Sequence, residues 1–245
     1  MKTMTTLSLA LAALLFVISP CQAGFFEDLS REVISSQPQS SLDNSTIVKG
    51  LKEALAVGTE RAVTEVAKPD GYFGNQLIKI LLPDKIQKVA NLLGTMGYQQ
   101  QVDEFVLSMN QAAEKAAPKA ASFFGDAIRQ MSVEDARGIL SGGDTAATTY
   151  FEKKTRGKLY DAFKPSIAKS MEQVGTVQAY KKMIGTYDAV PLASLAGAPS
   201  LDLDHYVTNK ALDGLFAMVG VEEKKIRTNP AAQTTDLLRK VFGGK

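Results

Sequence analysis

The chain of 245 residues carries 28 Lys and Arg against 26 Asp and Glu, so its formal net charge is only +2. This balance argues against a nucleic-acid-binding protein, which usually shows a clear basic excess. One Cys and one His leave too few side chains for a thiolate or histidine metal centre, and the absence of Trp lowers the weight of a carbohydrate-binding function.

The first 23 residues have the pattern of a cleavable export signal. Lys2 lies in a short polar start, and the apolar run from Leu7 to Ile18 follows it. Cys21 and Ala23 supply the small residues that a signal peptidase requires before its cleavage point. The pattern therefore predicts a signal peptide over 1–23.

Two alternatives for this segment are weaker. A transmembrane anchor needs about 20 apolar residues, and this run is shorter and ends at Pro20. A lipid anchor on Cys21 is disfavoured because Pro20 is a poor residue directly before a lipidated cysteine. We expect an exported, periplasmic protein of a Gram-negative-type bacterium that begins at Gly24. Cleavage would also remove the only thiol, so the mature chain would have no disulfide and no thiol nucleophile.

Apolar residues that recur every three or four positions predict that the rest of the chain is helical. A short helix and a linker are expected over 24–42, and a single all-helical domain over 43–245. Within that domain helices are expected at 45–67, 98–116, from Pro118, from Ser132, at 144–174, 176–184 and 204–228, and in a last segment ending at Phe242. The predicted fold is an all-α, compact multi-helix bundle of about eight or nine helices.

Three positions along these helices carry sharper expectations. Ser132 and Asp135 are three residues apart and form a weak variant of the capping box. Pro165 lies inside the long helical segment and predicts a kink or two helices. Residues 185–201 are rich in Gly, Pro, Ala and Ser, which predicts a loop and the place where a hinge or lid would lie.

One stretch, Leu77 to Leu82, departs from helical spacing. The alternation Ile78-Lys79-Ile80 favours a short strand or an extended segment. A lone strand makes no stable sheet, so we expect at most one small β-hairpin, near 77–82. If the two isoleucines point into the core, Lys79 points the other way, to solvent or to a polar cleft.

The most distinctive local segment runs from Asp70 to Asn75, where two glycines permit tight turns. A functional interpretation has Asp70, Tyr72 and Asn75 converging on a ligand, with Lys79 contacting an anion or a polar head group. The simpler alternative, which the sequence favours, is a structural turn followed by a lysine that reaches water along an apolar surface.

The single histidine, His205, stands beside Asp202 and Asp204 at the start of a helix. These three residues are weak candidates for a small metal or proton site. The sequence favours the interpretation in which the two acids cap the helix and face its positive end. No cofactor is predicted.

Several segments together resemble the bacterial domain-of-unknown-function family DUF4197, from about Ser41 to Phe242. They are Asp202 to Phe216, Glu222 to Arg227, Asn229 to Ala232, Thr234 to Leu238, Asp70 to Asn75 and Ile78 to Pro83. The sequence departs from the family pattern at Gln233, where Arg is usual, and at Leu81, where Pro is common. The resemblance implies a mostly helical, exported bacterial protein and no assigned reaction, so it contributes no catalytic residues.

Three functions are compatible with these observations. The first is non-enzymatic binding of a hydrophobic or amphipathic small molecule, with the turn at Asp70–Lys79 at the mouth of a pocket. The second is a structural or interaction module that binds a protein of the cell envelope. The third, ranked last, is a hydrolase whose site would gather Asp70 and Lys79 with His205 or Asp204.

Overall fold

The computed structural model describes residues 44–188, 202–229, 233, 235 and 239. Helices make up 82% of this part and no strand occurs in it, which confirms the all-α class. In chain order its elements are α2 (Asn44–Ala67), α3 (Asp84–Thr95), α4 (Gln99–Ala116), the 3-10 helix η1 (Ala117–Lys119), α5 (Ala120–Arg129), α6 (Val133–Ser141), α7 (Ala146–Val174), α8 (Thr176–Asp188) and α9 (Leu203–Thr228). Because η1 joins α4 to α5 without a break, the described part holds seven continuous helices, and the expected number of eight or nine is slightly off.

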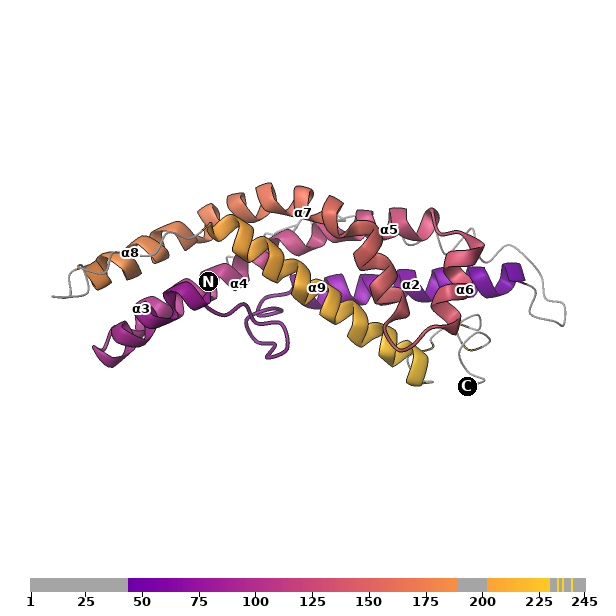
Figure 1. Cartoon of the computed structure of the whole chain (residues 1–245), viewed down its shortest axis with the longest axis horizontal. Coiled ribbons are helices and arrows are strands. Elements are labelled where there is room, and N and C mark those ends of the chain that lie inside the picture. Colours follow the sequence, from indigo (N-terminus) through magenta and orange to yellow (C-terminus); the bar gives the residue numbers. More distant parts are fainter. Residues whose placement is uncertain (1–43, 189–201, 230–232, 234, 236–238, 240–245) are drawn as a thin grey trace, which may run out of the picture.

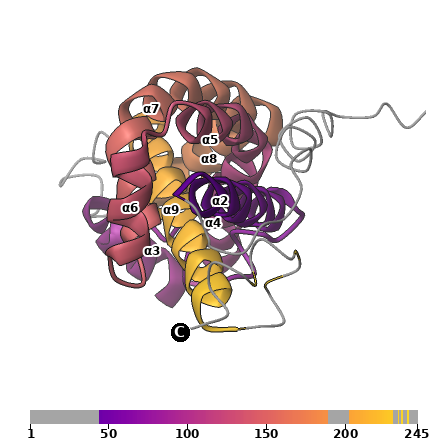
Figure 2. The same ribbon diagram turned by 90° about the vertical axis from the view of Figure 1, so that its right-hand side faces the viewer.

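The helices form an elongated bundle around α2 (Figure 1). Seen from its end, the bundle places α2 in the middle (Figure 2), and α2 contacts α4, α5, α6 and α9. The helices α3 and α8 contact each other and make up one end of the bundle, and α6 lies at the other end.

Aromatic side chains fill the core where the long helices meet. Phe124 of α5 packs edge-on against Phe151 of α7 and Phe216 of α9, with ring centroids 5.3 and 6.0 Å apart. Phe105 and Phe163 are also fully buried. Burial of each such side chain contributes about 1.5–3 kcal/mol, so these rings are a main source of stability for the bundle.

No helix was expected at α3, yet its sequence carries a helical signal. Its buried residues Ile86, Val89, Ala90 and Leu93 follow the three-to-four spacing of an amphipathic helix. Gly97, with φ of 86°, lies just beyond its end in a conformation that favours glycine. The helix has only 12 residues, so its stripe is short and easily missed beside the non-helical segment that precedes it.

Three expectations about α6, α7 and α8 have clear outcomes. The capping box is confirmed, because Ser132 Oγ accepts from Asp135 N at 3.0 Å and Asp135 Oδ2 accepts from Ser132 N at 3.1 Å. A single helix rather than two runs through the exposed Pro165, and Figure 1 shows α7 bending along its length. Residues 185–188 belong to α8 and are not part of a loop.

Other expectations lie outside the described residues. They concern the signal peptide at 1–23, the helix and linker at 24–42, the loop over 189–201 and the last helix ending at Phe242. In the part of the chain that the structure covers, no helix is long and apolar enough to cross a membrane.

The segment between α2 and α3 is irregular, and its residues 77–82 form no hairpin in the structure. The alternation read from the sequence is confirmed, since Ile78 and Ile80 are buried and Lys79 is half-buried. A strand partner is unnecessary here, because Ile78 N and Lys79 N donate to Asn75 O and side chains of neighbouring helices bond the backbone of Ile80 and Leu81.

Candidate functional site

Asn110 of α4 stands in for a strand partner. Its buried amide accepts from Ile80 N at 2.8 Å through Oδ1 and donates to Ile80 O at 2.9 Å through Nδ2. One side chain thus satisfies both backbone groups of Ile80, as a paired strand would. This clamp fixes the backbone directly after Lys79.

Glu114, one turn further along α4, holds the preceding turn. Its Oε1 accepts from Tyr72 N at 3.1 Å and from Phe73 N at 3.3 Å. Desolvation by burial raises the pKa of the Glu114 carboxyl above its ordinary value, and these backbone donors only partly offset that rise.

Tyr72 anchors the turn to α9. Its side chain is fully buried, and its hydroxyl donates to Ala211 O at 2.6 Å. Burial raises the pKa of this hydroxyl far above its ordinary value, so Tyr72 stays protonated. Gly214 makes room for the ring, because a Cβ at that position would lie 2.7 Å from Tyr72 Cε1.

The four residues singled out by the sequence therefore do not converge on one ligand-sized space. The backbone N–H and the hydroxyl of Tyr72 both form hydrogen bonds within the protein. Asp70 is exposed and has a φ of 60°. Asn75 uses its Oδ1 to accept from Leu77 N at 3.0 Å and its Nδ2 to donate to Met218 Sδ at 3.4 Å. Of the four, Lys79 alone lines the groove described next.

An open groove of about 680 Å³ lies between α3 and α4 and reaches the segment that carries Lys79. Apolar and polar side chains share its surface in similar proportion. Its lining residues are Lys79, Leu81, Leu82, Gln87, Ala90, Asn91, Gly94, Thr95, Gln99, Val102, Asp103 and Val106. A volume of this size is within the range of small-molecule sites.

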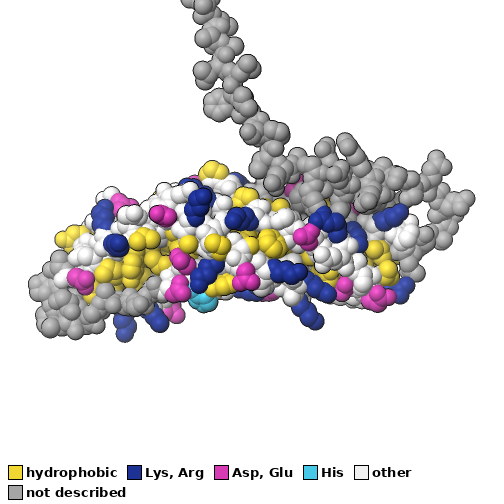
Figure 3. Space-filling model, turned by 90° about the horizontal axis from the view of Figure 1, so that it is seen from above, with side chains coloured by type: hydrophobic (Ala, Val, Ile, Leu, Met, Phe, Trp, Pro, Cys, Tyr) yellow, Lys and Arg dark blue, Asp and Glu magenta, His cyan; other side chains and the backbone are white. Residues whose placement is uncertain are grey.

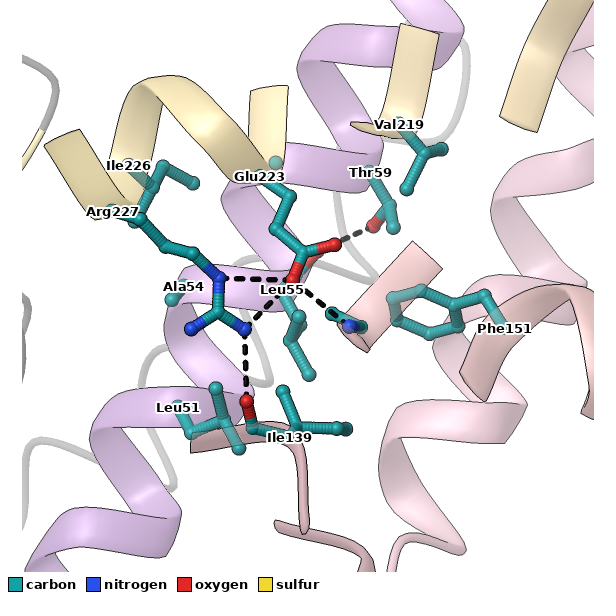
Figure 4. Close-up of a pocket in the computed structure, with 12 residues that line it drawn as sticks. Leu51, Ala54, Leu55, Thr59, Ile139, Phe151, Val219, Glu223, Ile226 and Arg227 are labelled. Atoms are coloured by element: carbon teal, nitrogen blue, oxygen red, sulfur yellow. Dashed lines mark hydrogen bonds and ion pairs between the residues drawn. The ribbon is translucent and has the colours of Figure 1, made fainter. Parts of the chain in front are cut away.

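The interior near α6 offers far less space. A cavity of about 20 Å³ lies among α2, α6, α7 and α9 (Figure 4), which is room for roughly one water molecule. Glu223 and Arg227 project to its edge from α9, with Arg227 Nη2 2.7 Å from Glu223 Oε1. Arg227 also donates to Ile139 O at 2.9 Å.

Glu223 binds the first turn of α7 as a cap supplied by another helix. Its carboxylate accepts from Ala147 N at 2.9 Å and from Thr148 N and Thr148 Oγ1, both at 2.8 Å. The positive end of α7 and Arg227 together balance this buried charge. Through these contacts Glu223 and Arg227 link α9 to α7 and α6.

The N-cap interpretation of Asp202 is confirmed, since its side chain accepts from His205 N at 2.9 Å. His205 is exposed, is the one cyan side chain in Figure 3, and lies with its Nδ1 2.7 Å from the Tyr160 hydroxyl of α7. Neither Asp202, Asp204 nor His205 lines the α3–α4 groove. In the described part of the chain no three His, Cys, Asp or Glu side chains are grouped to hold a metal ion.

A hydrogen bond links the segment at 77–82 to the first turn of α9, which carries His205. Tyr206 of α9 donates from its hydroxyl to Leu81 O at 2.8 Å. The groove does not gather Asp70 and Lys79 with His205 or Asp204, which is the arrangement that a hydrolase site built on these residues would need.

Sequence analysis did not single out Asn110 and Glu114, the two polar side chains that hold residues 72–80. A signal was available, because they lie one turn apart on α4 among apolar residues such as Val106 and Ala113. Two polar side chains on an otherwise apolar helix surface either face water or are buried and bind another segment. The spacing of residues along the helix does not distinguish the two cases. Only contact with residues 72–80 decides it.

The described part of the chain is a helical bundle with a packed interior and open grooves beside α4, one of about 680 Å³ against α3 and one of about 380 Å³ against α8. Its family follows from comparison with known proteins: the model of the family described as "Protein of unknown function (DUF4197)" matches residues 41–243, and the chain belongs to this family. No curated protein and no solved structure matches the chain.

The structure places both positions at which the sequence was expected to depart from the family pattern. Gln233 is buried and donates from Nε2 to Ile226 O at 3.1 Å, close to the end of α9. Leu81 is exposed and accepts the Tyr206 bond through its carbonyl, a group that proline also possesses. A proline at position 81 would keep that contact.

Proposed function

We propose that the protein is a non-enzymatic binding protein that takes an amphipathic small molecule into the α3–α4 groove. The observation that carries the proposal is the size of this groove, about 680 Å³, against about 380 Å³ for the groove between α4 and α8 and about 20 Å³ for the cavity near α6. The α3–α4 groove gives a ligand of ordinary size the most room of the three.

The groove surface suits a molecule with both apolar and polar parts. Leu82, Ala90, Val102 and Val106 offer apolar contact. The side-chain amides that share the groove can accept and donate hydrogen bonds. They are Gln87, Asn91 and Gln99.

A tryptophan reporter tests this proposal, because the chain contains no Trp of its own. Asn91 and Leu92 are adjacent exposed residues of α3, and Asn91 lines the groove whereas Leu92 does not. The Asn91→Trp variant should show a saturable change in fluorescence when decanoate or decyl glucoside is added below its micelle-forming concentration. The Leu92→Trp variant should show none.

Failure of both amphiphiles to change the Asn91→Trp emission would overturn the proposal. Equal changes in the two variants would show general adsorption to the surface and would count against the groove as well. If Asn91→Trp alone responds, extraction and mass spectrometry of the purified wild-type protein would identify the molecule that accompanies it from the cell.

Location is part of the proposal. The pattern of residues 1–23 supports export to the periplasm with cleavage before Gly24. N-terminal sequencing of protein recovered from the periplasmic fraction should read from Gly24. A blocked N-terminus with a lipid on Cys21 would instead show an anchored protein.

A second candidate function is an interaction module of the cell envelope. It is favoured by Leu77 and Leu81, which are 65% and 62% exposed on the same irregular segment. A stable homo-oligomer that dissociates on Leu77→Ser substitution would favour this function over small-molecule binding.

A further inference from the structure

We infer that the molecule taken into the α3–α4 groove is an anionic single-chain amphiphile whose head group contacts the Lys79 ammonium. This inference rests on the proposed function and adds the charge, the shape and the orientation of the ligand. Four features of the groove carry it.

The first feature is that Lys79 is held in place. Its neighbours Ile78 and Ile80 are buried, and Asn110 binds both backbone groups of Ile80. The Lys79 Nζ lies 3.9 Å from the centroid of the Phe73 ring, a contact that orients the ammonium further. An ordered cation loses less conformational entropy on binding an anion than a free lysine does.

The second feature is that this cation has no carboxylate partner in the described part of the chain. No ion pair of Lys79 occurs among the described residues, whereas Lys182 pairs with Glu104 at 3.0 Å and Arg156 with Glu152 at 2.9 Å. Unlike the exposed lysines that also have no ion pair, Lys79 is half-buried and lines a groove. An unpaired cation on such a residue is complementary to an anionic group.

The third feature is the position of the groove's own acid. Asp103 accepts from Gln99 Nε2 at 2.8 Å and lies seven residues, or roughly 10 Å, along α4 from Asn110, which marks the Lys79 end. The groove is therefore positive at one end and negative toward the other. The Asp103 carboxylate repels an anionic group at its end of the groove. A ligand with one anionic head group therefore binds with that head group at Lys79.

The fourth feature is the apolar strip between the two charges. Val102 and Val106 are one turn apart on the same row of α4, and Ala90 lines the groove from α3. Ala90 and Val102 are only 4% and 5% exposed, so they form an apolar floor of the groove against which an alkyl chain can lie.

The test compares three amphiphiles with the same chain: decanoate, decyl glucoside and decyltrimethylammonium. Each is titrated below its micelle-forming concentration, with calorimetry as the readout. Wild-type protein should bind decanoate most tightly and the cationic amphiphile most weakly. Because the head-group contact is electrostatic and partly open to water, added salt should weaken decanoate binding more than decyl glucoside binding.

Substitution of Lys79 separates charge from the apolar contact. Lys79→Gln should weaken decanoate binding by about tenfold and leave decyl glucoside binding unchanged. Lys79→Arg should retain most of the decanoate affinity. Lys85→Gln is the matched control, since Lys85 is exposed on α3 and does not line the groove, and it should change neither affinity.

The outcomes distinguish this inference from the proposed function. If decanoate and decyl glucoside bind equally well and Lys79→Gln affects neither, the anionic head group is ruled out while small-molecule binding in the groove stands. If no amphiphile binds to wild-type protein, the proposed function fails as well. Thermal melting of the Lys79 variants identifies any affinity loss that results from unfolding.

Discussion

Buried polar side chains on α4 and α9 act over long stretches of sequence. Asn110 and Glu114 reach back 30 and 42 residues to the segment around Ile80 and Tyr72, and the Tyr72 hydroxyl reaches forward 139 residues to Ala211. The bonds of Asn110 and Glu114 satisfy backbone groups that would otherwise lack a partner, at a cost of about 1–3 kcal/mol each, and the bond to Ala211 satisfies the buried Tyr72 hydroxyl. These few residues hold the irregular segment against α4 and α9.

Glu114 gives a prediction about pH. Its folded-state pKa is raised, so between the ordinary and the raised pKa the folded protein binds a proton that the unfolded chain has lost. The stability that this proton contributes is present below the unfolded-state pKa and is lost as pH rises through the folded-state pKa. Relative to Glu114→Gln, which keeps an acceptor oxygen, wild-type protein should lose stability as pH rises above about 4, the ordinary pKa of a glutamate, and through the raised folded-state pKa.

Chemical denaturation of both proteins across that range measures the difference in unfolding free energy. Asp135 and Glu104, whose pKa values are lowered, act in the opposite direction but are common to both proteins and cancel. A difference that does not vary with pH, or one that grows in favour of the wild type as pH rises, contradicts the prediction.

At the scale of elements, buried and exposed side chains alternate in the segment between α2 and α3, although the segment belongs to no sheet. Ile80 is 1% exposed and Leu81 is 62% exposed, although they are neighbours. Helices α4 and α9 take the place of strands on the two sides of this segment, through Asn110 and Tyr206. Alternating burial therefore does not require β pairing, since here it begins in a turn in which Ile78 N and Lys79 N donate to Asn75 O.

A pair of alanine substitutions tests this arrangement. Ile80→Ala should lower the free energy of unfolding by about 2–5 kcal/mol, because it leaves a cavity under the segment. Leu81→Ala should change it by less than about 0.5 kcal/mol, because that side chain is in water. Urea denaturation of the two variants gives both values, and similar losses would refute the alternation.

At the scale of the whole molecule, α9 joins parts of the bundle that are distant in sequence. Glu223 binds the first turn of α7, and Arg227 binds the last residues of α6 through Ile139 O. The surface contributes much less to this cohesion, because Figure 3 shows charges of both signs dispersed over the face that includes α7 and α8.

Removal of the Glu223 carboxylate should destabilise the bundle strongly. Glu223→Ala removes the carboxylate that pairs with Arg227 and accepts from two backbone N–H groups of α7, at an expected cost of about 3–5 kcal/mol. Glu152→Ala removes an acid from an exposed pair on α7 and should cost less than about 1 kcal/mol. Thermal and urea unfolding measure the loss of stability in both variants. Equal losses would show that Glu223 contributes no more to the bundle than an exposed ion pair does.

The sequence by itself determined the features that depend on neighbours within one or two helical turns. These are the helical stripes, the capping box at Ser132, the cap at Asp202 and the alternation around Lys79, all of which follow from local periodicity and local hydrogen bonding. Only the tertiary structure decided that Tyr72 and Asn75 form hydrogen bonds within the protein and that Lys79 lines a groove. The physical reason is that the partners which bury a side chain or leave it unpaired come from helices far away in the chain, and periodicity carries no information about them.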